Sequence, residues 1–280
     1  MRDVFLQIDT YAEPTPLAAI DQAVRFAKLL DCSLTGLAVH IDIHVPDNWL
    51  AERLLHVQKL AAVEEAKSLE AAQTLLKYMT ATATTEGVRC EETIVRANVH
   101  RVGDAIANLA RTRDLALVPL GNRLDAQRLV AEDVLFGSGR PMLAFHPEGA
   151  PLPSGKLGRV AIAWDRSRCA ARAVSDALPL LKQAGDVRIV TVVGEKASAK
   201  SGLAIDLVRH LKCFGIVTEI DEVDGRGRSI GASLDAYVDK YAPQLMVMGG
   251  YGTSKLKEFV LGGATEHVLN RLRVATLLSH

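Results

Sequence analysis

The strongest constraint on the fold of this chain is an internal repeat. Residues 4–9 and 160–165 are each a short apolar run that ends in an acidic residue, and a polar turn follows both. Alanine-rich stretches come next, at residues 17–30 and 170–182, with apolar residues at spacings of three and four. Such spacing is typical of a helix with one buried face. The sequence therefore predicts two copies of one α/β unit, each opening with a strand and a helix.

The order of elements agrees between the two repeats as far as their last strands. We expect the later strands at residues 33–39, 90–95, 115–120 and 141–145, and at 187–192, 217–223, 245–248 and 275–278. Helices are expected between them, including a long one at residues 49–85 and a shorter counterpart at 198–215. Apolar strands that alternate with helices indicate a parallel sheet covered on both faces. The predicted fold class is α/β, with two tandem doubly wound, mostly parallel five-stranded sheets of Rossmann-like type.

The boundary between the repeats is predicted where turn-forming residues gather, at 147–155. This places a first domain at residues 1–147, a linker at 148–155 and a second domain at 156–280. The last strand of each repeat is expected to pair with the other edge to edge, so that one chain forms a pseudo-dimer. A homodimer of whole chains stays open.

The composition excludes several kinds of partner. Lys+Arg and Asp+Glu number 33 each, with no long run of either sign, which disfavours binding to nucleic acid. No apolar run approaches the roughly 20 residues that a membrane helix needs. Four well-separated cysteines indicate neither a disulfide framework nor a zinc site. We expect a cytoplasmic protein that contacts neither nucleic acid nor membrane.

A glycine-rich segment follows the fourth strand of the second repeat. Its glycines are Gly249, Gly252, Gly262 and Gly263. Glycine allows close backbone approach and positive φ angles, so that successive N–H groups can surround a phosphate. Because a helix is expected next, its unpaired N–H groups would add to the attraction for an anion. The segment predicts a phosphate-binding loop.

Other groups near this loop can donate hydrogen bonds to phosphate oxygens. Thr253 and Thr265 supply hydroxyl groups, and Ala264 supplies a backbone N–H at the start of the expected helix.

The spacing Gly249-x2-Gly252-x9-Gly262 resembles the glycine signature of nucleotide-binding universal stress proteins. The resemblance covers the whole chain as a tandem pair and implies the adenine nucleotide alpha hydrolase-like fold. The family places Ser or Thr directly after the third glycine, where this chain has Gly263. One hydroxyl that contacts phosphate is therefore missing, and we expect weaker binding.

The same resemblance assigns the other end of the nucleotide. Asp165 matches the acid that contacts the adenine–ribose end, and Val192 and Met248 match residues that line the base. The implied ligand is ATP or a related adenine nucleotide, with any Mg²⁺ carried by it.

The first repeat lacks the glycine loop. Arg128 and Leu129 stand where the second repeat has its last glycine pair, and we expect these bulky side chains to fill the phosphate position. Asp9 and Val39 persist there as remnants of the fold. We expect the first repeat to bind no nucleotide.

Each assigned residue also has a plainer interpretation. Asp165 can cap the following helix, and Val192 and Met248 can be core residues. A solvated acidic edge is likewise favoured over a Mg²⁺ site for Asp221, Glu222 and Asp224, near the end of the third strand.

Three functions follow from these patterns. The first is a stress-response regulatory protein that binds an adenine nucleotide in its second domain, acts on unidentified protein partners and hydrolyses ATP slowly at most. The alternative is a nucleotide-free interaction scaffold of the same fold. An enzyme such as an adenylyl transferase is disfavoured, because the sequence has no HxGH-type or SGGxDS-type motif and no recognisable catalytic group.

Overall fold

The computed structural model describes residues 1–45, 57–121, 124–194, 202–250 and 263–280. The strands of the first repeat are β1 (Asp3–Ile8), β2 (Ser33–Asp42), β3 (Cys90–Asn98), β4 (Leu115–Pro119) and β5 (Met142–Phe145). Its helices are α1 (Leu17–Leu30), α3 (Val57–Glu86), α4 (Val102–Ala110) and α5 (Leu124–Gly137). A short 3₁₀ turn, Val99–Arg101, precedes α4.

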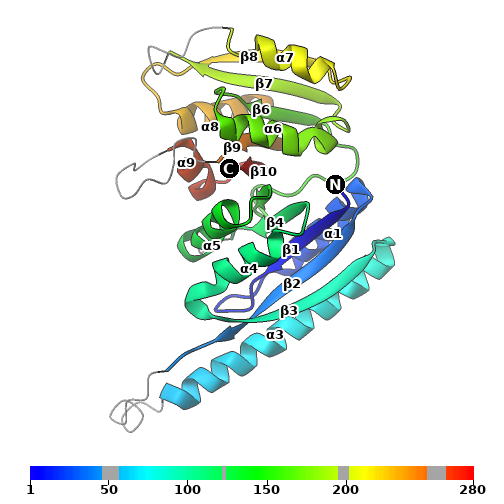
Figure 1. Ribbon diagram of the computed structural model, residues 1–280, viewed down its shortest axis with the longest axis vertical. Helices are drawn as coiled ribbons and strands as arrows, with labels where there is room; N and C mark the ends of the chain where they lie inside the picture. The colour runs from blue at the N-terminus through cyan, green and yellow to red at the C-terminus, as the bar shows by residue number, and fades with distance from the viewer. Residues whose placement is uncertain (46–56, 122–123, 195–201, 251–262) are drawn as a thin grey trace.

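The second repeat has the same order of elements. Its strands are β6 (Arg159–Ala163), β7 (Asp186–Val193), β8 (Thr218–Asp224), β9 (Leu245–Gly249) and β10 (Thr276–Ser279). Its helices are α6 (Arg168–Leu181), α7 (Ile205–Lys212), α8 (Ile230–Tyr241) and α9 (Ala264–Asn270). Figure 1 shows the two repeats stacked along the long axis of the molecule.

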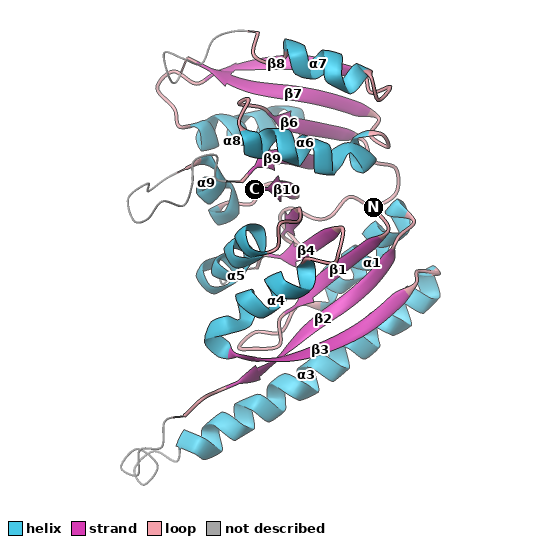
Figure 2. Cartoon of the chain, viewed as in Figure 1, coloured by secondary structure: helices cyan, strands magenta, loops and turns pink. Residues whose placement is uncertain are grey.

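All of these strands belong to one sheet of ten strands, in the order β3-β2-β1-β4-β5-β10-β9-β6-β7-β8. Within each repeat the neighbouring strands are parallel, and only the β5–β10 pair is antiparallel. Figure 2 shows the strands continuing as one sheet through both repeats. The predicted five-stranded units are present, and the expected pairing of the two last strands joins them.

Helices cover both faces of the sheet because its strands are apolar on both sides. One core cluster joins β1 residues such as Val4 and Leu6 to α1, α3, α6 and α7. The other joins Phe5, on the opposite face of β1, to α4, α5, α8 and α9. Side chains alternate between the faces of a strand, so central strands such as β1, β5, β9 and β10 contribute to both cores. This arrangement confirms the predicted α/β class.

Two helices differ in extent from the sequence prediction. The long helix expected at 49–85 is described from Val57, where α3 begins, and it ends at Glu86. The helix expected at 198–215 is shorter, since α7 runs from Ile205 to Lys212. The residues before each helix, 46–56 and 195–201, lie outside the described part of the chain. The predicted linker, 148–155, lies between β5 and β6.

Candidate functional site

The strand register makes the two repeats directly comparable. In the first, Val4 pairs with Leu34 and Leu115, and in the second Val160 pairs with Val187 and Leu245. Counting from these pairs gives the equivalent positions at the carboxyl ends of the strands. They are Asp9 and Asp165, Val39 and Val192, Val118 and Met248, and Pro119 and Gly249.

The predicted base-lining residues of the second repeat come together at one edge of the sheet. Met248 and Gly249 end β9, Asp165 follows β6, and Val192 lies near the end of β7. These strands are neighbours in the order β9-β6-β7. Ligands of doubly wound sheets bind beyond the carboxyl ends of the strands, where the strand order reverses. The structure therefore brings these four predicted residues to the end of the sheet where such a crevice is expected, and Met248 is buried there as a core residue.

Asp165 is exposed and orders the turn before α6. Its Oδ1 accepts a hydrogen bond from the backbone N–H of Ser167 at 2.9 Å. The Ser167 hydroxyl in turn accepts one from the N–H of Ala170 at 3.1 Å and caps the helix. The plainer interpretation of Asp165 as the helix cap is therefore wrong, because Ser167 has that role.

Gly249 is required by packing. A Cβ atom at this position would lie 2.5 Å from the backbone nitrogen of Ala170 and 2.8 Å from the carbonyl carbon of Cys169. The missing side chain lets the first turn of α6 lie directly on the end of β9. In the first repeat the equivalent position is Pro119.

Gly263 is under no such restriction. It precedes α9 with φ −68° and ψ 159°, a conformation open to any residue, and a Cβ atom there would meet nothing within 4 Å. Ala264 begins α9, and the next residue, Thr265, is buried. The other predicted loop residues, Gly252, Thr253 and Gly262, lie outside the described residues.

The equivalent crevice of the first repeat is closed by its own side chains. Gln127 of α5 accepts a hydrogen bond from the N–H of Gly121 at 2.6 Å, and its Nε2 donates to Asp9 Oδ2 at 3.3 Å. Gln7 Nε2 donates to the other carboxylate oxygen of Asp9 at 2.9 Å. Burial raises the pKa of Asp9, and these two amide hydrogen bonds only partly oppose the shift.

The Val39 carbonyl of the first repeat is also engaged. It accepts hydrogen bonds from the hydroxyl groups of Thr10 and Ser68, and these two oxygens lie 2.7 Å apart. Ser68 comes from α3, the long helix. In the first repeat, the polar groups at the positions equivalent to Asp165 and Val192 thus have hydrogen-bond partners within the repeat itself.

The prediction that Arg128 and Leu129 fill a phosphate position is wrong. Both lie inside α5, Leu129 is 57% exposed, and Arg128 reaches across to the second repeat. There its NH1 lies 3.0 Å from Asn270 Oδ1 and 3.4 Å from Glu266 Oε1 on α9. Gln127 closes the crevice instead. No periodicity or motif identifies this glutamine, because its partners lie far away in the sequence.

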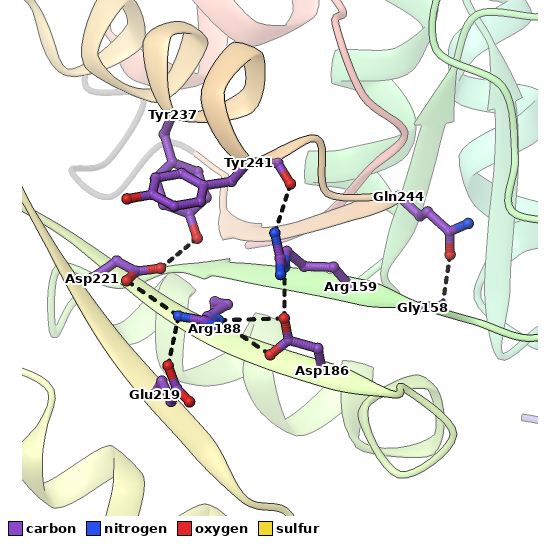
Figure 3. Close-up of polar contacts among 9 residues, drawn as sticks. All are labelled: Gly158, Arg159, Asp186, Arg188, Glu219, Asp221, Tyr237, Tyr241 and Gln244. Carbon is purple, nitrogen blue, oxygen red and sulfur yellow. Dashed lines mark hydrogen bonds and ion pairs between the residues drawn. The ribbon is translucent and has the colours of Figure 1, made fainter.

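Asp221 belongs to a polar network beneath α8 (Figure 3). It accepts a hydrogen bond from the Tyr237 hydroxyl at 2.7 Å, and Arg188 NH1 lies 3.5 Å away. Its side chain is only 18% exposed, so the prediction of a solvated acid is wrong here. Asp224 does lie at an exposed strand end, where it pairs with Arg226 at 2.8 Å.

The rest of this network ties α8 to the sheet. Arg159 Nε lies 2.6 Å from Asp186 Oδ2, and its NH1 donates to the carbonyl of Tyr241 at the end of α8. Burial opposes ionisation of Asp186, but Arg159 and Arg188 outweigh it and lower its pKa. The network is thus structural.

Within the described part of the chain, no three His, Cys, Asp or Glu side chains are placed to hold a metal ion. None of its helices combines the length and apolarity needed to cross a bilayer.

The fold and the crevice define a tandem, doubly wound α/β protein of Rossmann-like type. The model of the Universal stress protein family matches residues 156–280, which make up the second repeat, and the first repeat has the same strand topology. A universal stress protein from Archaeoglobus fulgidus DSM 4304 is similar over 98% of this chain and 95% of its own, with 17% identity and a TM-score of 0.71. A putative universal stress protein from Pseudomonas aeruginosa UCBPP-PA14 covers 100% of this chain with 93% of its own, at 13% identity and a TM-score of 0.56. A search among curated protein sequences gives no match.

Proposed function

We propose that the second repeat binds ATP or a related adenine nucleotide beyond the ends of β6, β7 and β9, as a regulatory event in a stress response. The observation that carries the proposal is the difference between equivalent positions. Asp9 is hydrogen-bonded by Gln7 and Gln127, whereas Asp165 is exposed beside the crevice. The match of the second repeat to the model of the Universal stress protein family supports the same ligand class.

The proposed roles follow the shape of the nucleotide. Asp165 would accept hydrogen bonds from the ribose, and Val192 and Met248 would form the apolar wall for the base. The backbone N–H groups of residues 263–265 would meet the phosphates, together with Gly252, Thr253 and Gly262 of the loop. Mg²⁺ would arrive with the nucleotide and be held mainly by its phosphates.

The proposed activity is binding with slow turnover at most. The residues assigned above position a nucleotide, and none of them is placed as a general base. A robust ATPase rate that disappears in Gly252→Ala would contradict this regulatory role.

The test is calorimetric titration of ATP and AMP, with Mg²⁺, into the full chain. We expect one nucleotide per chain and a loss of about tenfold in affinity for Asp165→Asn, since a hydrogen bond to a charged acceptor is lost. Asp9→Asn is the matched control in the first repeat and should leave the affinity unchanged. Gly262→Arg, which places a bulky side chain in the glycine loop, should abolish binding.

If the wild-type titration shows no binding, the result would instead favour the second candidate, a nucleotide-free interaction scaffold. Gly263, where the family has a hydroxyl, is the observation that favours it. Under either function the protein partners, a cytoplasmic location and a possible homodimer remain predictions from the sequence.

A further inference from the structure

A pocket of about 280 Å³ lies where the two repeats meet. The first repeat supplies the two residues that follow β4 and the residue after β5, and the second repeat supplies the last residue of α9 and the turn that follows it. We call this the seam pocket, and its lining residues are Leu120, Gly121, His146, Asn270, Arg271, Leu272 and Arg273. Figure 1 shows α5 and α9 side by side near this junction.

Among the described residues, the lining of the seam pocket carries positive charge and no acidic side chain. Arg273 NH1 lies 2.6 Å from Asp239, and Arg271 NH1 lies 3.9 Å from Asp235. Both arginines are exposed, and ion pairs at exposed positions contribute little to the stability of the fold. A guanidinium group has five N–H donors, and within the described residues these pairs engage only NH1 of each arginine. Donors therefore remain for a ligand.

His146 is held in one orientation. Its Nδ1 accepts hydrogen bonds from the backbone N–H groups of Glu148 at 3.1 Å and Gly149 at 3.0 Å. The neutral ring therefore carries its proton on Nε2, which becomes a donor. Asn270 is fixed in a similar way, because Arg128 donates to its Oδ1 and leaves its NH₂ group as the donor. The polar side chains of the pocket thus offer donors.

The equivalent place on the other side of the pseudo-twofold axis is filled. There the ring of Phe136 packs edge-on against His280 at 4.8 Å, and His280 Nδ1 lies 3.0 Å from the carbonyl oxygen of Gly250. By register His280 is equivalent to His146, and Phe136 to Asn270. Arg271 and Arg273 take the places of Gly137 and Gly139. The two arginines of the seam pocket are therefore specific to one side of the molecule.

We infer that the seam pocket binds a small oxyanion, a free phosphate or a phosphomonoester, between His146 of the first repeat and Arg271 of the second. Donors that come from different elements around one pocket suit a tetrahedral oxyanion, and arginine forms strong charge-assisted bonds to phosphate. The volume leaves room for a small organic group beyond the phosphate. Because its walls come from both repeats, the ligand would strengthen their contact.

The test is NMR of the His146 imidazole during titration of inorganic phosphate into the full chain, with the signal identified through His146→Gln. We expect a saturable shift in the wild type and about tenfold weaker binding in Arg271→Ala, as for the loss of one charge-assisted contact. Arg209→Ala removes an exposed, paired arginine of α7 and should change nothing. A phosphate-dependent rise in Tm should be lost in Arg271→Ala alone.

Two controls separate this site from other effects. Sodium chloride at matched ionic strength should not reproduce the shift, since screening alone acts on any exposed charge. Asp165→Asn should keep the shift, which makes the result independent of the nucleotide crevice. An unmoved His146 signal in the wild type, an equal response in Arg271→Ala or the same shift with chloride would each overturn the inference.

Discussion

Leu143 of β5 lies directly opposite Leu277 of β10, and the two leucines occupy the same position in the two repeats. Both side chains are fully buried. A pseudo-twofold axis therefore passes between them, and the ten-stranded sheet continues through the contact. The junction of the repeats is thus built like the interior of a domain.

Leu277→Ala should destabilise the whole chain, because it opens a cavity at this axis. We expect a loss of about 2–5 kcal/mol in the free energy of unfolding, as for other buried leucines. Urea unfolding followed by circular dichroism and by tryptophan fluorescence should give coincident transitions. Leu129→Ala, at an exposed position, should cost less than about 0.5 kcal/mol. Separate transitions for the two repeats would contradict a shared core.

Gly249→Ala should be far more damaging than Gly263→Ala. The new methyl group would strike the backbone of α6, which cannot move aside as a side chain can, and overpacking of this kind costs about 1–3 kcal/mol or more. At Gly263 the added methyl group meets open space. Thermal unfolding of the two variants checks the difference. Equal values of Tm would show that the approach of α6 to β9 is loose.

Gly263→Ser should strengthen nucleotide binding, given the proposed site. The backbone at this position accepts a serine without strain, and its hydroxyl would restore the donor that the family places there. We expect an increase in affinity of about three- to tenfold, the range for one hydrogen bond. Titration with ATP measures it. Gly263→Ala supplies the methyl group without the hydroxyl, and an equal gain in that variant would exclude the hydroxyl as the cause.

Asp9→Asn should alter how stability depends on pH. Burial holds the pKa of Asp9 above its ordinary value of 3.8, so the folded protein binds this proton more tightly than the unfolded chain does. The stability from this group is present at low pH and is lost as the pH rises from 3.8 through the folded pKa. The stability of Asp9→Asn relative to wild type should therefore increase across that window. Urea unfolding at several pH values checks it, and a difference that is constant with pH would contradict the raised pKa.

Tyr237→Phe should weaken the attachment of α8 to the sheet. Burial and the hydrogen bond to Asp221 raise the pKa of Tyr237, so its hydroxyl remains a donor at neutral pH. Its removal should cost about 1 kcal/mol in the free energy of unfolding. Tyr11→Phe, at an exposed tyrosine, is the control and should have no measurable effect. A neutral result for both would mean that solvent replaces the bond.

The architecture could be predicted because it depends on local signals. Apolar runs such as 4–9 and 160–165 identify buried strands, and the shared order of elements gives the parallel topology. The pairing of β5 with β10 was also predictable, since last strands with exposed edges need a partner.

The polar contacts of the crevices were not predictable in the same way. Gln127 and Asp9 are 118 positions apart, and a hydrogen bond at that separation leaves no periodic trace. The role of Gly249 in packing α6 was hidden for a related reason, because a glycine after a strand has the same sequence pattern whether it approaches a helix or a ligand. The sequence identified Asp221 as an acidic residue near the end of a strand. It could not identify the partners of this residue, Tyr237 and Arg188.

The axis between Leu143 and Leu277 also bears on how such a protein can evolve. Two identical subunits that meet at a twofold axis change together, because one gene encodes both. In a chain that carries both repeats, each repeat can be substituted independently of the other. Gln7 and Gln127 occur in one repeat only, where the other has Ala163 and Leu261. A chain of this kind allows one repeat to form internal hydrogen bonds at positions where the other repeat keeps exposed groups.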